Sequence, residues 1–203
     1  PHGAFDAPAF APLPQEKRIL IFATYAPYKG LPQLIEIFRG LQAADPAVQL
    51  TVAGSDHPRF PGYLNQVRET VGGFPEIEWR VGVPETDLPA LFASARVVAL
   101  PYTATTGASS VVHRASAHGR PVVAYDLPDL RTVAAEENLR LELVPAGDRT
   151  AFARRLGDLL DDPALCETIG RGNAATMKTM TLDITCQRYI QLFEKAIACK
   201  MAL

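Results

Sequence analysis

The chain has 203 residues, of which 48% are hydrophobic and 21% are charged, and its formal net charge at pH 7 is −2. These proportions are typical of a soluble globular protein. The nearly balanced charge argues against a nucleic-acid partner and against an anionic membrane surface. No apolar run approaches the roughly 20 residues that a membrane-spanning helix needs.

The first 17 residues contain four prolines, which oppose a regular helix or strand. We interpret residues 1–17 as an interdomain linker or as the end of an upstream domain. The chain starts with Pro1 rather than Met and lacks the charged and apolar segments of a signal peptide. We therefore expect it to be a piece of a longer protein.

From residue 18 to about residue 180, short apolar runs alternate with segments of helical periodicity. The apolar runs predict six strands: Arg18–Ala23, Val48–Ala53, Ile77–Val81, Val97–Leu100, Val122–Tyr125 and Leu139–Val144. The periodic segments predict helices over residues 31–44, 63–71, 88–94, 108–119, 130–137, 150–160 and 163–177. Thr86 and Asp148 are placed to cap the helices that follow them. Residues 181–203 predict an amphipathic C-terminal helix, which we expect to pack toward a missing first domain.

Cysteine and histidine usage favours the cytoplasm and no metal site. The three cysteines are odd in number and widely spaced, at Cys166, Cys186 and Cys199. Such spacing is typical of reduced thiols rather than of a disulfide framework. The four histidines, His2, His57, His113 and His118, are scattered, so we expect surface or loop positions for them. No Cys/His spacing indicates zinc, and no Asp-x-Asp cluster is present.

Six strands that alternate with helices predict an α/β fold with an open, mostly parallel sheet and helices on both faces. Ligands of such sheets bind beyond the carboxyl ends of the strands, at the point where the strand order reverses. The loops that leave those ends span residues 24–30, 54–58, 82–86, 103–110 and 126–129. We expect these loops to line one crevice, with Lys29 as its cation.

The stretch from Val97 to Tyr125 predicts a strand, a glycine-containing loop, a helix of small residues and a second strand, which together form a βαβ unit. The first turn of such a helix presents backbone N–H groups and the positive end of the helix dipole, and an anion often binds there. The loop matches neither G-x-G-x-x-G nor G-x-x-x-x-G-K-[ST]. Taken alone, residues 103–110 are therefore better explained as an ordinary capped helix start.

Short motifs in a fixed order add a resemblance that covers nearly the whole chain. They are Pro1-His-Gly3, Tyr28-Lys-Gly30, Val52-Ala-Gly54, Val81-Gly-Val-Pro84, Ala117-His-Gly-Arg-Pro-Val-Val123 and Val144-Pro-Ala-Gly-Asp148. In order and spacing they resemble the second, donor-binding half of family 4 (group 1) retaining glycosyltransferases, in which two Rossmann-like domains face each other across a cleft.

This resemblance implies a Rossmann-like sheet that binds a nucleoside diphosphate sugar, UDP- or GDP-linked, without a metal or another cofactor. Lys29 would contact the diphosphate, and the loop and helix start at Thr105, Thr106, Gly107, Ala108, Ser109 and Ser110 would cradle it. Gly54, Val83 and Pro84 would lie against the nucleoside. The intact enzyme would transfer a hexosyl unit to an acceptor. The acceptor groups, part of the catalytic machinery and any contact with the inner face of a membrane would belong to the missing domain, so we expect this piece alone to be inactive.

The chain departs from the family pattern at three positions. The two carboxylates of the family's Glu-x7-Glu motif, which normally contact the sugar and the ribose, fall on Thr106 and Arg114, and an arginine that usually accompanies the lysine falls on Thr24. In one explanation the donor is held differently, with Arg114 reaching a phosphate. In another, Arg114 pairs with a nearby carboxylate and the chain is a non-catalytic binding or interaction domain. A sugar-nucleotide epimerase is a third, weaker alternative.

Overall fold

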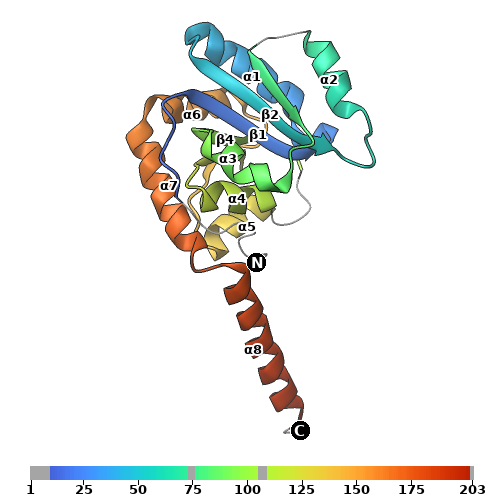
Figure 1. The fold of residues 1–203 in the computed structure, drawn as a ribbon, viewed down its shortest axis with the longest axis vertical. Coiled ribbons are helices and arrows are strands. Elements are labelled where there is room, and N and C mark those ends of the chain that lie inside the picture. Colours follow the sequence, from blue (N-terminus) through green and yellow to red (C-terminus); the bar gives the residue numbers. More distant parts are fainter. Residues whose placement is uncertain (1–9, 73–75, 105–108, 202–203) are drawn as a thin grey trace.

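The computed structural model describes residues 10–72, 76–104 and 109–201, which form one α/β body and a projecting C-terminal helix (Figure 1). Within the described residues, six parallel strands make a single sheet in the order β3-β2-β1-β4-β5-β6. The strands are β1 (Lys17–Tyr25), β2 (Val48–Asp56), β3 (Ile77–Val81), β4 (Val97–Leu100), β5 (Val122–Tyr125) and β6 (Glu142–Val144). This confirms the predicted fold class, and the strand order reverses between β1 and β4.

Helices cover both faces of the sheet, which explains why residues 19–23 of β1 and all of β4 are apolar. On one face, Ile19 and Ile21 of β1 pack under α1 (Leu31–Ala44), α2 (Tyr63–Val71) and α6 (Arg149–Asp161). On the other, Leu20 packs with α3 (Leu88–Ala93), α4 (Ser110–Ala117) and α5 (Pro128–Glu136). The helix α7 (Pro163–Met177) contributes to both cores. Short 3₁₀ turns, η1 (Pro27–Lys29) and η2 (Glu85–Asp87), precede α1 and α3.

The predicted boundaries hold for most elements, but the sixth strand is shorter than its alternating sequence suggests. Strand β6 begins at Glu142 rather than at Leu139. The backbone N–H of Arg140 donates to the Asn173 side chain at 2.8 Å, and the Asn173 amide donates back to the Arg140 carbonyl at 2.9 Å. A side chain of α7 therefore satisfies the backbone groups that a longer strand would have paired with β5.

Helix capping agrees with the sequence at α6 but not at α3. The Asp148 side chain accepts a hydrogen bond from the Ala151 N–H at 2.9 Å, as predicted. The prediction for Thr86 was wrong, because the 3₁₀ turn η2 leads directly into α3 and the N-cap residue is Asp87, which makes no side-chain cap. The chain enters α3 already coiled, so no extended capping residue is needed.

Two buried arginines fasten the chain that leads into β1. Arg120, which is fully buried, donates to the carbonyls of Ala11, Pro12, Phe92 and Ala93 at 2.7–3.1 Å. Burial lowers the pKa of Arg120 to about 10, which leaves it charged at neutral pH. Arg96 donates to the Leu160 carbonyl at 2.7 Å and to backbone carbonyls of residues 14 and 15. Residues 11–15 are therefore bound to the body.

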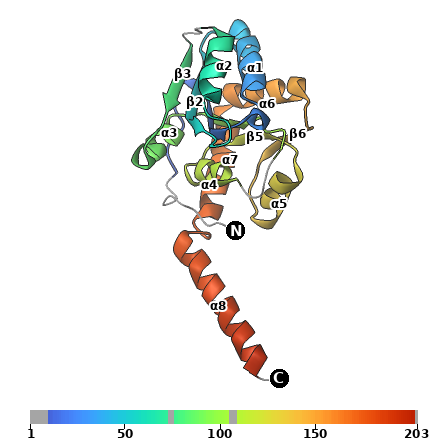
Figure 2. The ribbon, with the colours of Figure 1, turned by 90° about the vertical axis from the view of Figure 1, so that its right-hand side faces the viewer.

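The C-terminal helix α8 (Leu182–Met201) runs away from the body in both views (Figure 2). Its large apolar side chains lie on one side of the helix at 3.6 residues per turn and are 45–61% exposed: Leu182, Tyr189, Ile190, Leu192, Phe193 and Ile197. In the described part of the chain, none of the helices has the length and apolar character required to cross a membrane. The apolar stripe of α8 thus has no partner among the described residues.

We predict that Arg120→Met lowers the free energy of unfolding by about 3 kcal/mol, because it leaves buried carbonyls without a charged donor. Urea denaturation of the 203-residue chain measures this change. The control is Arg154→Met, since Arg154 is exposed on α6 and should contribute within about 0.5 kcal/mol. Equal stability of the two variants would contradict the fastening role of Arg120.

Candidate functional site

The loops that follow β1 and β4 lie side by side at the reversal of the strand order. The two strands are neighbours, with Ile19 opposite Val97 and Leu20 opposite Val98. Parallel strands place their carboxyl ends at the same edge of a sheet, so both loops leave from that edge. This is where a sheet of this topology binds its ligand.

A glycine permits the close approach of these two loops. Gly30 has φ +69°, in the left-handed region that favours glycine. A Cβ atom at this position would lie 2.0 Å from the Pro101 carbonyl oxygen. Beside this contact, the Thr103 N–H donates to the Tyr28 carbonyl at 2.9 Å. The approach places Lys29 directly against the loop that leads from β4 to α4.

Lys29 carries a half-buried positive charge. Its Nζ lies 3.9 Å from the ring centroid of Tyr102 and 5.4 Å from that of Tyr28. Burial lowers the pKa of Lys29, since the ammonium loses part of its hydration. Among the described residues, no carboxylate forms an ion pair with it. The side chain is thus suited to bind an anion that comes from outside the described part of the chain.

The helix start that should face this cation is only partly described. Thr105, Thr106, Gly107 and Ala108 of the sequence prediction lie outside the described residues. Ser109 is the N-cap residue of α4, with an extended backbone at φ −91° and ψ 114°. Its side chain makes no capping hydrogen bond, and Ser110 is exposed. The Ser109 side chain therefore does not occupy the first N–H groups of α4, which are the groups that a helix start offers to an anion.

The Arg114 side chain forms an ion pair with a carboxylate. The side chain is buried, and its Nη2 donates to Glu85 Oε1 of η2. Glu85 directly follows Val83 and Pro84, so the ion pair joins α4 to the loop predicted to contact a nucleoside. Val83 packs partly against the core, and Pro84 is exposed. The structure therefore shows a buried Arg114 that is paired with a carboxylate.

Gly54 has a packing role that the sequence motif alone did not show. It lies in β2 with φ +130°, and a Cβ there would come within 2.0 Å of the Ala23 carbonyl oxygen. Its own carbonyl accepts a hydrogen bond from the Gly82 N–H at 2.8 Å. Gly54 therefore brings the ends of β1, β2 and β3 together, whether or not a ligand contacts it.

The expectation that His113 and His118 are surface or loop residues was wrong. Both are buried, because α4 lies between the sheet and α7. His113 Nε2 lies 2.6 Å from a Glu137 carboxylate oxygen, and Nδ1 lies 3.2 Å from the Ser109 carbonyl oxygen. This pair links the end of α5 to the start of α4. The sequence offered no signal for it, since a single histidine in a helix of small residues has no recognisable spacing.

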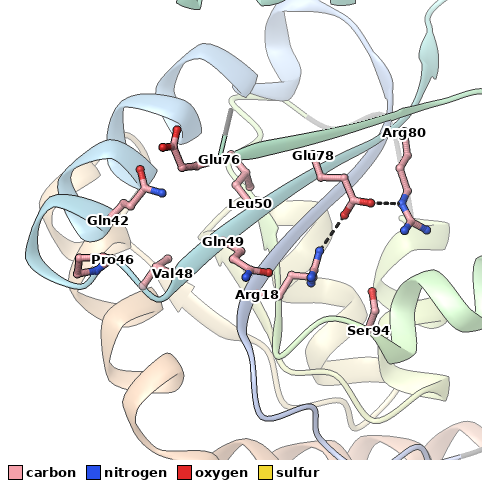
Figure 3. Close-up of a pocket in the computed structure, with 10 residues that line it drawn as sticks. All are labelled: Arg18, Gln42, Pro46, Val48, Gln49, Leu50, Glu76, Glu78, Arg80 and Ser94. Atoms are coloured by element: carbon pink, nitrogen blue, oxygen red, sulfur yellow. Dashed lines mark hydrogen bonds and ion pairs between the residues drawn. The ribbon is translucent and has the colours of Figure 1, made fainter. Parts of the chain in front are cut away.

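A separate polar pocket of about 450 Å³ lies near the amino ends of β1, β2 and β3 (Figure 3). Glu78 lies between Arg18 and Arg80, with nitrogen–oxygen distances of 2.8 and 2.7 Å, and Thr51 adds a hydrogen bond. Burial opposes ionisation of Glu78, but these hydrogen bonds outweigh it and lower its pKa. The charges of Arg18, Glu78 and Arg80 are already paired with one another, and the pocket is not at the edge where the candidate loops meet.

No group of three or more potential metal-binding side chains is found in the described ranges. The cation and the helix start at the reversal of the strand order define the candidate site as one for an anionic ligand, the class of site seen in doubly wound nucleotide-binding sheets.

Comparison with known proteins identifies the family. Residues 16–162 match the family model described as "Glycosyl transferases group 1", so the chain belongs to that family. It is 29% identical over 192 residues to a phosphatidyl-myo-inositol mannosyltransferase from Mycobacterium leprae, an alignment that covers 93% of this chain and 50% of the relative. The chain spans 40–50% of the length of the curated relatives that it matches.

Solved structures show the same fold. The Anabaena HepE protein in complex with UDP-glucose superposes with a TM-score of 0.73 at 20% identity, over 89% of this chain and 49% of that one. The C-terminal domain of the group 1 glycosyl transferase LpcC from Francisella tularensis gives a TM-score of 0.67 at 18% identity, over 82% of this chain and 87% of the other. The match to an isolated C-terminal domain agrees with the predicted resemblance to a second half.

We predict that Gly30→Ala lowers the free energy of unfolding by about 2 kcal/mol or more, because the new Cβ would collide with the Pro101 carbonyl at an unfavourable φ. The matched control is Gly40→Ala in α1, where no atom lies within 4 Å of the added Cβ. The control should be neutral or stabilising by about 0.5–1 kcal/mol. Thermal unfolding of both variants tests the prediction, which fails if they shift in the same direction.

Proposed function

We propose that this chain is the donor-binding half of a retaining glycosyltransferase, which transfers a hexosyl unit from a nucleoside diphosphate sugar to an acceptor. The observation that carries the proposal is the half-buried Lys29 ammonium, which has no carboxylate partner among the described residues and lies at the reversal of the strand order. The chain belongs to the group 1 glycosyltransferases, and HepE was solved in complex with UDP-glucose. Both findings support a nucleotide sugar as the anion that binds beside Lys29.

In this proposal the diphosphate lies between Lys29 and the start of α4. The N–H groups at Ser109 and Ser110, together with residues 105–108, donate to the phosphate oxygens. Gly54, Val83 and Pro84 lie on the nucleoside side. As the sugar–phosphate bond breaks, negative charge grows on the leaving diphosphate, and a fixed ammonium and fixed N–H donors stabilise that charge. These groups neutralise the diphosphate without a metal ion in our proposal.

The remaining catalytic groups and the acceptor site belong, in this proposal, to an upstream half of the same protein. The exposed apolar stripe of α8 is suited to cover that half, because such a stripe would otherwise remain in water. We infer that the isolated chain binds the donor without transferring its sugar. Two free cysteines among the described residues, Cys166 and Cys186, agree with a reducing cytoplasmic location.

One observation favours a non-catalytic binding domain instead. The position of the family's second carboxylate is occupied by Arg114, and the carboxylate of Glu85 already neutralises its guanidinium. A domain that kept the fold while losing its donor would tolerate such a change. Titration with UDP, GDP and ADP sugars distinguishes the two functions, since the alternative requires that none of them binds at millimolar concentration.

We predict that Lys29→Met weakens UDP binding about 10- to 100-fold, the effect of removing a charge-assisted contact worth about 1.5–3 kcal/mol. Isothermal titration calorimetry of the 203-residue chain measures the dissociation constant. Lys178→Met is the control, because Lys178 is exposed just beyond α7 and should leave the affinity unchanged. Wild-type affinity in Lys29→Met would remove the main support for the proposal.

We predict that Phe193→Asp destabilises the longer protein by about 2 kcal/mol if α8 covers the upstream half, since burying a phenylalanine contributes about that much. The same change should leave the isolated chain nearly unaffected, because Phe193 is already 61% exposed there. Gln191→Asp, on the polar face of α8, is the control in both proteins. Equal effects of Phe193→Asp in the two proteins would rule out this docking.

A further inference from the structure

Lys29 differs from the buried arginines of the α/β body in the groups that its charged end contacts. Arg120 and Arg96 are surrounded by carbonyl oxygens, and Arg114 faces the Glu85 carboxylate. Lys29 instead contacts two aromatic rings, with Tyr102 closest at 3.9 Å and Tyr28 at 5.4 Å. Both distances fall within the roughly 6 Å over which a ring face attracts a cation.

The surroundings of Tyr102 are suited to holding its ring in one position. It is the second residue after β4, its side chain is buried, and its hydroxyl lies 3.4 Å from the Phe22 carbonyl oxygen. Burial also raises the pKa of the Tyr102 hydroxyl, so the ring remains neutral around neutral pH. Its face therefore offers a rigid, uncharged surface beneath a flexible lysine side chain.

The choice of an aromatic ring over a carboxylate has an electrostatic consequence. A carboxylate in van der Waals contact would neutralise the ammonium and compete with any incoming phosphate. A ring face attracts the cation through its quadrupole but leaves the full positive charge in place. A lysine held in this way is pre-organised for an anion, and less side-chain entropy is lost when the anion binds.

We propose that Tyr102 is a positioning residue that holds the Lys29 ammonium over its ring, with Tyr28 as a second aromatic contact, so that the cation is in place before a diphosphate binds. The identity of the anion rests on the function proposed above. The positioning itself rests only on the distances, the burial of Tyr102 and the lack of a carboxylate partner for Lys29 in the described ranges.

Nuclear magnetic resonance of the ligand-free 203-residue chain tests the positioning without any nucleotide. A ring face shifts the ε-methylene protons of a lysine above it upfield, and Lys29→Arg assigns the signal. We expect the upfield shift in the wild type and in Tyr102→Phe, which keeps the ring, and its loss in Tyr102→Leu. An unshifted wild-type signal, or the same shift in Tyr102→Leu, overturns the proposal.

Calorimetry with UDP then measures the effect on binding. Tyr102→Leu should weaken UDP binding about 5- to 30-fold, whereas Tyr102→Phe should bind within about twofold of the wild type. In a Lys29→Met background the change at Tyr102 should have no further effect, since the residue acts through the lysine. Tyr28→Leu, a half-buried site, gives a smaller loss and serves if Tyr102→Leu does not fold.

The two proposals fail in different ways. If the wild type binds no UDP, GDP or ADP sugar but shows the upfield shift, the proposed function is wrong and the positioning stands. If the wild type binds UDP but Tyr102→Leu binds equally well, or loses the same affinity with and without Lys29, the positioning role is wrong and the proposed function stands.

Discussion

The contact between Gly30 and the Pro101 carbonyl is the constraint on which the candidate site depends. Without a side chain at residue 30, the loop after β1 settles onto the loop after β4, and the Thr103 N–H bonds to the Tyr28 carbonyl at 2.9 Å. Lys29 is carried with it onto Tyr102. Gly30 thus has its effect by allowing a close backbone approach, and this approach brings Lys29 and Tyr102 together at the edge where the strand order reverses.

The site combines one cation held by aromatic rings with another that is already paired. Lys29 has no carboxylate partner among the described residues, and partial burial makes a charge there more effective toward an anion because less water screens it. Arg114, by contrast, is buried and requires the Glu85 carboxylate, since an unpaired charge there would be strongly destabilising. The two cations therefore differ in their surroundings, because Lys29 contacts aromatic rings whereas Arg114 joins α4 to η2.

Much of the fold could be predicted because local pattern and tertiary structure agree. Apolar runs of four to six residues became strands, of which β4 and β5 are buried throughout, and Asp148 caps α6 as its position suggests. The failures occurred where distant residues intervene. Asn173 ends β6 early by bonding to the backbone of Arg140, and α7 covers the helix that contains His113. No local pattern contains either contact.

For the candidate site, the amino-acid sequence alone determined that the candidate loops leave from one edge of the sheet, since the parallel direction of the strands follows from their alternation with helices. The strand order, which makes the loops after β1 and β4 neighbours, was established only by the structure. The sequence also indicated Lys29, because a lysine followed by glycine and a helix start follows the first strand. Only the tertiary structure decided what surrounds that lysine and where Arg114 points. Tyr102 lies 73 residues after Lys29, and Glu85 lies 29 residues before Arg114. Contacts over such separations are set by the packing of the sheet and its helices.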